Sequence, residues 1–381
     1  MKIFGATKLA ETVIQTELCS GCGACIDLCP YFRSYRGKTA YLFPCTREEG
    51  RCFAYCPKVE VDPDGLSRFL FAKPYDGHPL GNWRSIHVAR AGARVKRQPF
   101  QSGGTVSALM YFSLRSGCIR GAILTGRKGL LPVPQLVTRP AGVWRHSLSK
   151  YTAAPTLAAL NRAIAAGHEA LGVVATPCQA TAIAQMRMNP LQNRSFRDHT
   201  ALVIGLFCTW ALDFRKFEAF LAERVPLKDI VKIDIPPPPA SVLEVYLQEE
   251  KREFPLDEIR LLVPDTCGYC LDMTSEFADV SVGVLEGHPE LNTLIVRTER
   301  GEEIVREAQR QEYIILDDMP VENREHLEWA AGNKKQRGLR RCMETGRLNG
   351  EAGTACLRLT GEVTDRILKN GRNGKESPCH T

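Results

Sequence analysis

Four cysteines near the amino terminus have the spacing of an iron–sulfur cluster site. They form the pattern C-x2-C-x2-C-x3-C-P and are Cys19, Cys22, Cys25 and Cys29, followed by Pro30. In ferredoxins with two clusters, the first three thiolates of this pattern bind one 4Fe-4S cluster and the fourth binds the other. Small residues at Gly21, Gly23 and Ala24 allow the backbone to approach the inorganic sulfides. The pattern therefore predicts iron–sulfur ligation.

A second group of cysteines repeats this pattern incompletely. Cys52 and Cys56, the latter followed by proline, match its end, but only Cys45 lies upstream. If the ferredoxin arrangement holds, Cys56 joins the first three cysteines of the motif around one cluster. Cys29, Cys45 and Cys52 then face the other cluster with one ligand missing. Three interpretations stay open: a four-iron cluster with a ligand from elsewhere, a three-iron cluster, or a lost cluster whose cysteines are structural.

Four further cysteines stand where strands are expected to end or in a C-x2-C pair. Cys178 follows the apolar stretch 170–176, Cys208 ends the stretch 200–208, and Cys267 and Cys270 form CGYC. Strand ends on one edge of a parallel sheet converge, so these thiolates could hold another 4Fe-4S cluster. Spacing alone also allows buried apolar cysteines, zinc or thiol redox chemistry. The cysteines expected to be incidental are Cys118, Cys342, Cys356 and Cys379.

The composition is that of a globular protein with a sizeable core. The chain has 381 residues, 44% hydrophobic and 24% charged, which suggests two or three domains. Its longest apolar run, residues 201–212, is too short to cross a bilayer, and the first residues lack the apolar region of a signal peptide. We therefore expect a cytoplasmic protein whose 15 cysteines serve metal or redox chemistry rather than disulfides.

The positive charge is concentrated near the carboxyl terminus. The net charge is +7, and residues 331–381 contain eleven Lys and Arg against five Asp and Glu. We expect a solvated tail or a docking arm for a larger complex. No nucleic-acid recognition motif accompanies the basic cluster, so no nucleic-acid partner is expected.

Composition shifts divide the chain into four parts. We expect a ferredoxin-like 4Fe-4S domain over residues 1–62, ending at the turn DPDG, and a linker over residues 63–84. A core follows over residues 85–330, and a basic tail of poorly ordered composition over residues 331–381.

The core has the sequence pattern of an α/β domain. Apolar strands are expected at residues 85–92, 121–126, 170–176 and 200–208, and helices at residues 104–117, 156–167 and 178–188. This alternation predicts a largely parallel, buried sheet. After the prolines of 235–240, residues 241–247 alternate as an edge or hairpin strand does, and residues 291–305 indicate a strand followed by a turn and a strand or helix.

Seven stretches of the core, in order, resemble the coenzyme F420 hydrogenase/dehydrogenase beta-subunit family. They are SGGTVSALM, LTGR, SKY, ATPCQATAI, IGLFC, CGYCLDMTSEFADVSVG and LNTLIVRTERGEEIV. The resemblance covers roughly residues 15–320. The relatives of this family include deazaflavin-reducing subunits of hydrogenases and formate dehydrogenases, and 7-hydroxymethyl chlorophyll a reductase.

The resemblance implies FAD and a nearby 4Fe-4S cluster. It strengthens the assignment of that cluster to the four core cysteines at positions 178, 208, 267 and 270. With the N-terminal module as an added electron inlet, two 4Fe-4S clusters are expected, and up to three. The fold implied is an α/β (α+β) flavin-binding core preceded by a small ferredoxin-like domain.

Several residues of the matched stretches fit flavin contacts. Gly103 and Gly104 precede a helix whose N-terminal N–H groups suit the FAD pyrophosphate. Arg127 and Lys150 are candidate cations for phosphate or for the N1–C2=O region of reduced flavin. The other cofactor-binding residues implied by the matched stretches are Ser102, Thr105, Ser107, Tyr151, Thr176, Pro177, Gln179 and Asp279. The family often has an acidic residue after SVG, whereas this chain continues SVGVLEGHPE, which leaves the local cofactor contacts open.

The resemblance implies an iron–sulfur flavoprotein oxidoreductase subunit. It would move electrons between clusters and FAD and exchange a hydride with a soluble carrier such as deazaflavin F420. The expected partners are subunits of a formate dehydrogenase, hydrogenase or heterodisulfide-reductase-like complex. No side chain is expected to be catalytic, because flavin N5 carries the chemistry. Two alternatives stay open: a stand-alone ferredoxin-dependent reductase of an organic substrate, and a non-catalytic electron-transfer or scaffold subunit.

Overall fold

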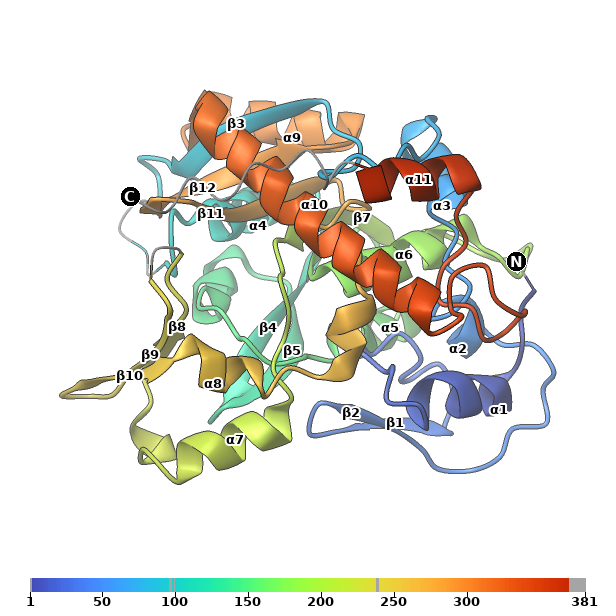
Figure 1. The fold of residues 1–381 in the computed structure, drawn as a ribbon. Helices are drawn as coiled ribbons and strands as arrows, with labels where there is room; N and C mark the ends of the chain where they lie inside the picture. The colour runs from blue at the N-terminus through green and yellow to red at the C-terminus, as the bar shows by residue number, and fades with distance from the viewer. Residues whose placement is uncertain (1, 96–97, 99, 238–239, 370–381) are drawn as a thin grey trace.

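An eight-stranded sheet forms the centre of the computed structural model, which describes residues 2–95, 98, 100–237 and 240–369 (Figure 1). The strand order is β13-β3-β12-β11-β7-β6-β4-β5. The strands are β3 (Ser85–Ala91), β4 (Gly121–Lys128), β5 (Leu131–Val137), β6 (Leu171–Ala175), β7 (Thr200–Leu206), β11 (Val280–Leu285), β12 (His288–Val296) and β13 (Ile314–Asp318).

Only the middle of this sheet is parallel. Strands β11, β7, β6 and β4 run parallel to one another, whereas β5 on one side and β12, β3 and β13 on the other pair antiparallel. The prediction of a largely parallel sheet is therefore wrong for both flanks. Strands β5 and β12 are antiparallel to their neighbours because short turns at Gly129 and Gly287 join them to β4 and β11. A connection this short can join only antiparallel strands.

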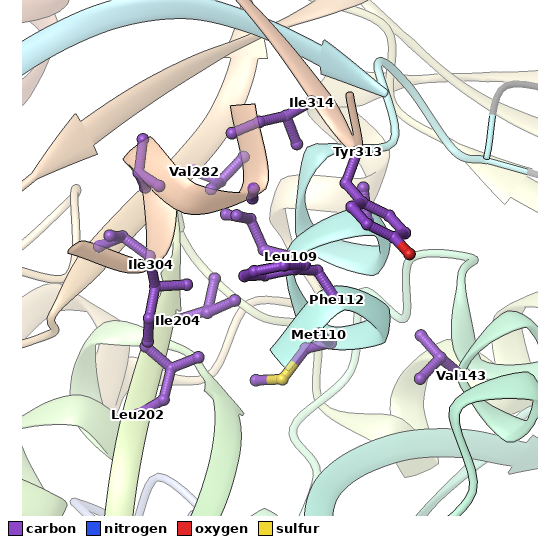
Figure 2. Packing of buried hydrophobic residues seen from close by; sticks show 14 of the residues in the cluster. Leu109, Met110, Phe112, Val143, Leu202, Ile204, Val282, Ile304, Tyr313 and Ile314 are labelled. Atoms are coloured by element: carbon purple, nitrogen blue, oxygen red, sulfur yellow. The ribbon is translucent and has the colours of Figure 1, made fainter. Parts of the chain in front are cut away.

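Helices cover both faces of the sheet because side chains alternate along its strands. Leu202 and Ile204 of β7 face a core shared with α4 (Thr105–Ser116) and α9 (Glu299–Arg310). Figure 2 shows Leu109 and Phe112 of α4 in this core. Val203 faces the other side, where α5 (Thr156–Ala165) and α6 (Pro177–Met188) pack. The core strands and helices expected up to residue 208 are confirmed.

A three-stranded antiparallel sheet accompanies the main sheet. Its order is β10-β9-β8, formed by Lys251–Pro255, Val242–Tyr246 and Lys232–Asp234. The hairpin strand expected at residues 241–247 is thus confirmed as β9. Around it lie α7 (Phe214–Ala222), α8 (Leu256–Arg260) and the short 3-10 turn η3 (Leu227–Asp229).

The N-terminal module packs directly onto α5, on the side of the sheet that α5 and α6 cover. It contains α1 (Ala6–Leu9), the π-helical turn η1 (Ala10–Ile14), the hairpin β1–β2 (Phe32–Tyr35 and Lys38–Tyr41) and α2 (Arg51–Ala54). The Leu157 N–H donates to the Cys22 carbonyl (3.1 Å), and Asn161 Nδ2 donates to the Ala24 carbonyl (3.1 Å). A Cβ on Gly23, whose φ is +85°, would lie 2.8 Å from the Ala158 nitrogen. The cysteine loop therefore meets the amino end of α5 without room for a side chain.

The expected linker and tail contain ordered elements. Residues 63–84 begin with α3 (Pro63–Phe71), which Asp62 caps by accepting from the Gly65 N–H (3.1 Å). Helix α10 (Val321–Glu344) continues through the boundary expected at residue 331 and crosses the front of the sheet (Figure 1). Helix α11 (Gly361–Lys369) follows. The expectation of poor order is wrong up to residue 369, because α10 buries side chains against the core; residues 370–381, with Cys379, lie outside the described residues.

The C-terminal segment joins the N-terminal module to the core. Arg358 forms an ion pair with buried Glu60 (2.9 Å), and the Gly353 N–H also donates to Glu60. Val61 and Leu357 pair in parallel as an isolated bridge. Within the described ranges, no helix is both long and apolar enough to cross a membrane.

A buried ion pair between Lys335 and Glu276 anchors α10 to the core. Lys335 and Glu276 are 1% and 2% exposed, and Lys335 Nζ lies 2.7 Å from Glu276 Oε1. Lys335 Nζ also donates to the Tyr75 hydroxyl (2.9 Å) and the His78 carbonyl (2.7 Å). Burial raises the pKa of Glu276 to about 7, although the Lys335 ammonium opposes this shift. Each of the two charges therefore depends on the other to remain ionised in this buried site.

We predict that Lys335→Met lowers the free energy of unfolding by about 3–5 kcal/mol, because it leaves a buried carboxylate without its cation. Urea unfolding followed by circular dichroism at pH 7 measures the loss. The exposed Lys73 provides the control, and Lys73→Met should change stability by less than about 0.5 kcal/mol. Adding Glu276→Gln to Lys335→Met should restore part of the loss, and an undiminished loss in the double variant would contradict this explanation.

Candidate functional site

Cysteines from both ends of the N-terminal module come together. Burial raises the pKa of Cys25 well above its usual range, and the neighbouring thiolates of Cys19, Cys22 and Cys56 raise it further. Burial likewise raises the pKa of Cys56, followed by the influence of Cys22. Such thiols stay protonated until iron displaces their protons. The grouping agrees with the ligand set expected for the first cluster.

The second group of the module contains three cysteines. Burial raises the pKa of Cys52 to about 11, and Cys29 and Cys45, which pack against the same apolar cluster, raise it further. The Cys45 N–H donates to the Tyr41 hydroxyl (2.7 Å), which fixes the backbone beside this group. Cys29, Cys45 and Cys52 are therefore neighbours, as the ferredoxin pattern predicts, and the three interpretations of this group stay open.

The four core cysteines meet at one edge of the main sheet. Cys178 is the second residue of α6 just after β6, and Cys208 follows β7. Cys267 lies in the 3-10 turn η4 (Asp265–Tyr269), and Cys270 follows it. Burial raises the pKa of Cys208 to about 12; the other three thiolates add to the shift, and the Lys334 ammonium opposes it. These mutual influences place the four thiols in one group, the core quartet.

Two buried lysines flank the core quartet. Lys58 Nζ donates to the Thr266 carbonyl (2.8 Å), and Lys334 Nζ donates to the carbonyls of Cys208 (2.6 Å) and Asp272 (2.7 Å). Burial by itself lowers the pKa of both lysines, but neighbouring anions outweigh burial and the net shift is upward. These anions are mainly thiolates of the quartet, with Asp272 added for Lys334 and Cys356 for Lys58. Both side chains are therefore cations beside the quartet.

The first group of the module lies next to the core quartet. After burial, Cys178 is the strongest influence that raises the pKa of Cys22, to about 12. A cavity of about 70 Å³ is lined by residues of the module, the core and the C-terminal segment, among them Lys58, Cys178, Cys270 and Cys356. The two thiol groups are therefore neighbours at the boundary between the module and the core.

Two cysteines expected to be incidental lie close to this boundary. Burial raises the pKa of Cys342 to about 12, and Cys356 adds to the shift. Cys356 in turn influences Cys56 and lines the cavity. Across the described residues, no three His, Cys, Asp or Glu side chains converge closely enough to hold a single metal ion.

The glycine turn expected to bind pyrophosphate is closely packed. A Cβ on Gly103 would lie 2.7 Å from Asn292 Oδ1, and one on Gly104, whose φ is +81°, would lie 2.7 Å from the Phe100 ring. Asn292 Oδ1 accepts from the Thr105 N–H (3.2 Å), and Asn292 Nδ2 donates to Ser102 Oγ (3.2 Å). Ser107 Oγ lies 3.2 Å from Ser147 Oγ. Phosphate contact at this turn therefore requires Asn292 and Phe100 to move.

Three of the expected flavin residues share a basic pocket. Arg127, Lys150 and Tyr151 line it together with Lys232, in a cavity of about 30 Å³. Burial lowers the pKa of Lys150 to about 8, and the Arg127 cation lowers it further. Tyr151 donates to Asp234 Oδ1 (3.0 Å). Gln101, just before the glycine turn, accepts from the Ser149 N–H (3.2 Å), so the turn and the pocket are neighbours.

The remaining expected flavin residues bond within the protein. Thr176 and Gln179 form a capping box at the start of α6, and Gln179 Nε2 also donates to the Ala154 carbonyl (2.8 Å). Pro177 lines the cavity beside the core quartet rather than the basic pocket. The Asp279 carboxylate accepts from the Val203 N–H (2.7 Å) and the Thr298 hydroxyl (2.8 Å). Asp279 therefore ties β7 to the start of α9, which favours backbone capping over a cofactor contact.

Sequence reasoning missed four residues of these sites. Lys58 directly follows the Cys56-Pro57 pair, and its position there was the one available signal. Lys232, Asn292 and Lys334 carry no such signal, because each reaches its site from a distant part of the chain.

Models of known families match most of this region. The model of the coenzyme F420 hydrogenase/dehydrogenase beta subunit N-terminus matches residues 86–161, and that of its C-terminus matches residues 168–322. The chain belongs to the coenzyme F420 hydrogenase/dehydrogenase beta-subunit family. A 4Fe-4S binding domain matches residues 12–31 of this family member, which confirms the iron–sulfur prediction for the N-terminal motif.

Two relatives of this beta-subunit family member are known by function. It is 28% identical over 327 residues to a coenzyme F420-dependent sulfite reductase of Methanocaldococcus jannaschii, covering 82% of this chain and 49% of the relative. The chain thus spans about half the length of that relative. It is 29% identical over 248 residues to a coenzyme F420 hydrogenase subunit beta of Methanothermobacter thermautotrophicus, covering 64% of this chain and 86% of the relative.

A solved structure has the same fold as this family member. A chain of the F420-reducing NiFe hydrogenase complex from Methanosarcina barkeri aligns with a TM-score of 0.64, covering 70% of this chain and 94% of that chain at 22% identity. The expected α/β class with an N-terminal ferredoxin-like segment is confirmed. The protein is an iron–sulfur member of an oxidoreductase family.

The residues present fit the implied cofactors unequally. The core quartet offers four half-buried thiols and two cations, which suits an anionic 4Fe-4S cluster. The basic pocket suits a phosphate, and Thr105 Oγ1 is buried beside the glycine turn without a hydrogen-bond partner among the described residues. The basic pocket encloses about 30 Å³, which leaves room for an anionic group but not for a whole flavin ring.

We predict that Cys267→Ser removes about four irons per chain, because a 4Fe-4S cluster needs its four thiolates. Iron and sulfide quantitation of anaerobically purified protein measures the change. Cys118→Ser is the matched control, since Cys118 contacts Ser116 and lies outside all three thiol groups. Unchanged iron content in Cys267→Ser would refute the core cluster.

We predict that ADP, the diphosphate half of FAD, binds the basic pocket more weakly as the pH rises through about 8, where Lys150 loses its proton. Loss of this cation should weaken binding roughly tenfold, about 1.4 kcal/mol. Calorimetry between pH 7 and pH 9.5 measures the affinity. Lys150→Arg should bind without this pH dependence, and Lys150→Met should match the wild-type protein at pH 9.5. A wild-type pH profile in Lys150→Met would exclude Lys150 as the titrating group.

Proposed function

We propose that this protein moves electrons between 4Fe-4S clusters and FAD and exchanges a hydride with a soluble deazaflavin carrier. The N-terminal cluster of Cys19, Cys22, Cys25 and Cys56 is the inlet or outlet, and the core quartet holds the next cluster. The observation that carries this proposal is the proximity of the two groups, since Cys178 packs against the apolar cluster that contains Cys22 and is the strongest thiolate influence on the pKa of Cys22.

The arrangement supports electron transfer because its parts are fixed relative to one another. The carbonyls of Cys22 and Ala24 accept hydrogen bonds from the Leu157 N–H and from Asn161 Nδ2 of α5. The turn η4 is tied to the module by the Thr266 hydroxyl, which donates to the Leu18 carbonyl. Clusters pass single electrons, so a constant separation is what the protein supplies. We infer that residues 1–62 form the electron-transfer module and residues 85–330 the flavin and cluster core.

The flavin and its carrier are inferred from the basic pocket and the relatives. FAD bound there would convert single electrons into a hydride. Arg127, Lys150 and Lys232 would hold its phosphates or the anionic tail of a carrier. The relatives named above depend on or belong to enzymes of coenzyme F420, so a deazaflavin is the proposed carrier. The proposed partners are catalytic subunits of a larger redox complex or a ferredoxin.

Mixing the anaerobic holoprotein with reduced coenzyme F420 tests this function. One hydride supplies two electrons, so the absorbance of the oxidised carrier should return while two cluster electrons appear by electron paramagnetic resonance. NADH should not replace the carrier. Unchanged carrier and cluster spectra, with FAD and iron both quantified in the sample, would contradict the proposed hydride chemistry.

The same assay, repeated with two variants, tests the order in which the cofactors pass the electrons. Cys267→Ser should leave oxidation of the carrier by the flavin intact but stop reduction of the N-terminal cluster. Cys118→Ser should behave as the wild-type protein. Reduction of the N-terminal cluster at an unchanged rate in Cys267→Ser would place the core quartet outside the path.

A further inference from the structure

The two lysines of the core quartet are buried cations without a carboxylate partner of their own. Lys58 and Lys334 are 6% and 5% exposed. Among the ion pairs of the described residues, neither lysine takes part, and their Nζ atoms donate to the main-chain carbonyls of Thr266, Cys208 and Asp272. Burial of an uncompensated ammonium group is costly, so its counter-charge must lie nearby.

With a bound cluster, whose ligands are thiolates, the core quartet supplies the counter-charge of both lysines. The carbonyls that hold them belong to Thr266, which precedes Cys267, and to Cys208 itself. Lys334 also bonds the Asp272 carbonyl, and that carbonyl accepts from Cys270 Sγ (3.3 Å). Both ammonium groups are thus fixed on the segments that carry the quartet, from two directions: Lys58 from the N-terminal module and Lys334 from α10.

The nearest carboxylate, that of Asp272, raises the pKa of Lys334 less than Cys270 and Cys208 do. Asp272 lies beside Lys334, but its side-chain oxygens accept from the Thr274 N–H (2.9 Å) and the Glu276 N–H (2.8 Å). Glu276 is already paired with Lys335. The positive charge of Lys58 and Lys334 is therefore directed mainly at the thiolates.

The neighbouring N-terminal group has a different environment. Apart from burial and backbone N–H groups, the strongest influences on Cys22, Cys25 and Cys56 are other cysteines. For Lys58, the leading thiolate neighbours are Cys270 and Cys267 of the quartet rather than Cys56. Two adjacent clusters would therefore sit in unequal fields, one beside two fixed cations and one among thiolates.

We propose that Lys58 and Lys334 hold the core cluster at a higher reduction potential than the cluster of Cys19, Cys22, Cys25 and Cys56, so that an electron entering through the N-terminal module comes to rest on the core cluster. This inference rests on the proposed core cluster. Reduction adds one electron to a cluster that is already anionic with its four thiolates, and no group leaves. Fixed positive charge in a buried site stabilises that added charge, which raises the potential.

Potentiometric titration of the anaerobic holoprotein, poised with dithionite and mediators and read by electron paramagnetic resonance, tests the proposal. The core signal is identified as the one absent from Cys267→Ser. We expect it to appear at a higher potential than the N-terminal signal. Lys334→Met should make the core cluster at least about tenfold harder to reduce, a fall of about 59 mV. Lys334→Arg should retain most of the wild-type potential, because it keeps the charge.

Two further variants distinguish between the ways in which the proposal could fail. Lys58→Met should lower the core potential in the same direction, which covers a Lys334 variant that fails to fold. Lys251→Met, at an exposed lysine of β10, should leave both potentials unchanged. An unmoved core potential in Lys334→Met and Lys58→Met with full iron content would overturn this proposal alone. A wild-type protein without the core signal would instead overturn the proposed function.

Discussion

The close contact between the N-terminal cysteine loop and the amino end of α5 is the constraint on which the rest of the structure depends. Gly23 meets the backbone of Ala158 and Pro155 with no room for a Cβ, so the loop has one position relative to the sheet. That position brings Cys22 next to Cys178. Because electron transfer between clusters depends on a constant separation, this contact is what the proposed path through the two thiol groups requires.

The C-terminal segment closes this contact from the other side. Glu60, four residues after Cys56, is buried only because Arg358 and the Gly353 N–H compensate its charge. The segment around Leu357 then pairs with Val61 as a short strand would. A stretch that is basic and rich in glycine in the sequence therefore ties the two ends of the chain together, since its Arg358 pairs with Glu60, 298 positions earlier in the chain.

Local patterns predicted much of the fold and part of the site. Strand and helix periodicity identified the core, and cysteine spacing identified the N-terminal motif, because both depend on residues close in sequence. The antiparallel flanks and the burial of Lys334 depend on which distant segments meet, which no local pattern contains. Asp279 shows the same limit within a motif: its role is decided by the Val203 N–H, 76 residues away.

Adjacent lysines of α10 act on different parts of the protein. Lys335 neutralises Glu276, while Lys334, one residue earlier and turned by about 100° around the helix, faces the quartet. Both lie beyond residue 322, where the match to the family core ends. If the proposed core cluster is held there, its reduction potential can be changed from a helix outside the family core, without altering any of the four cysteines.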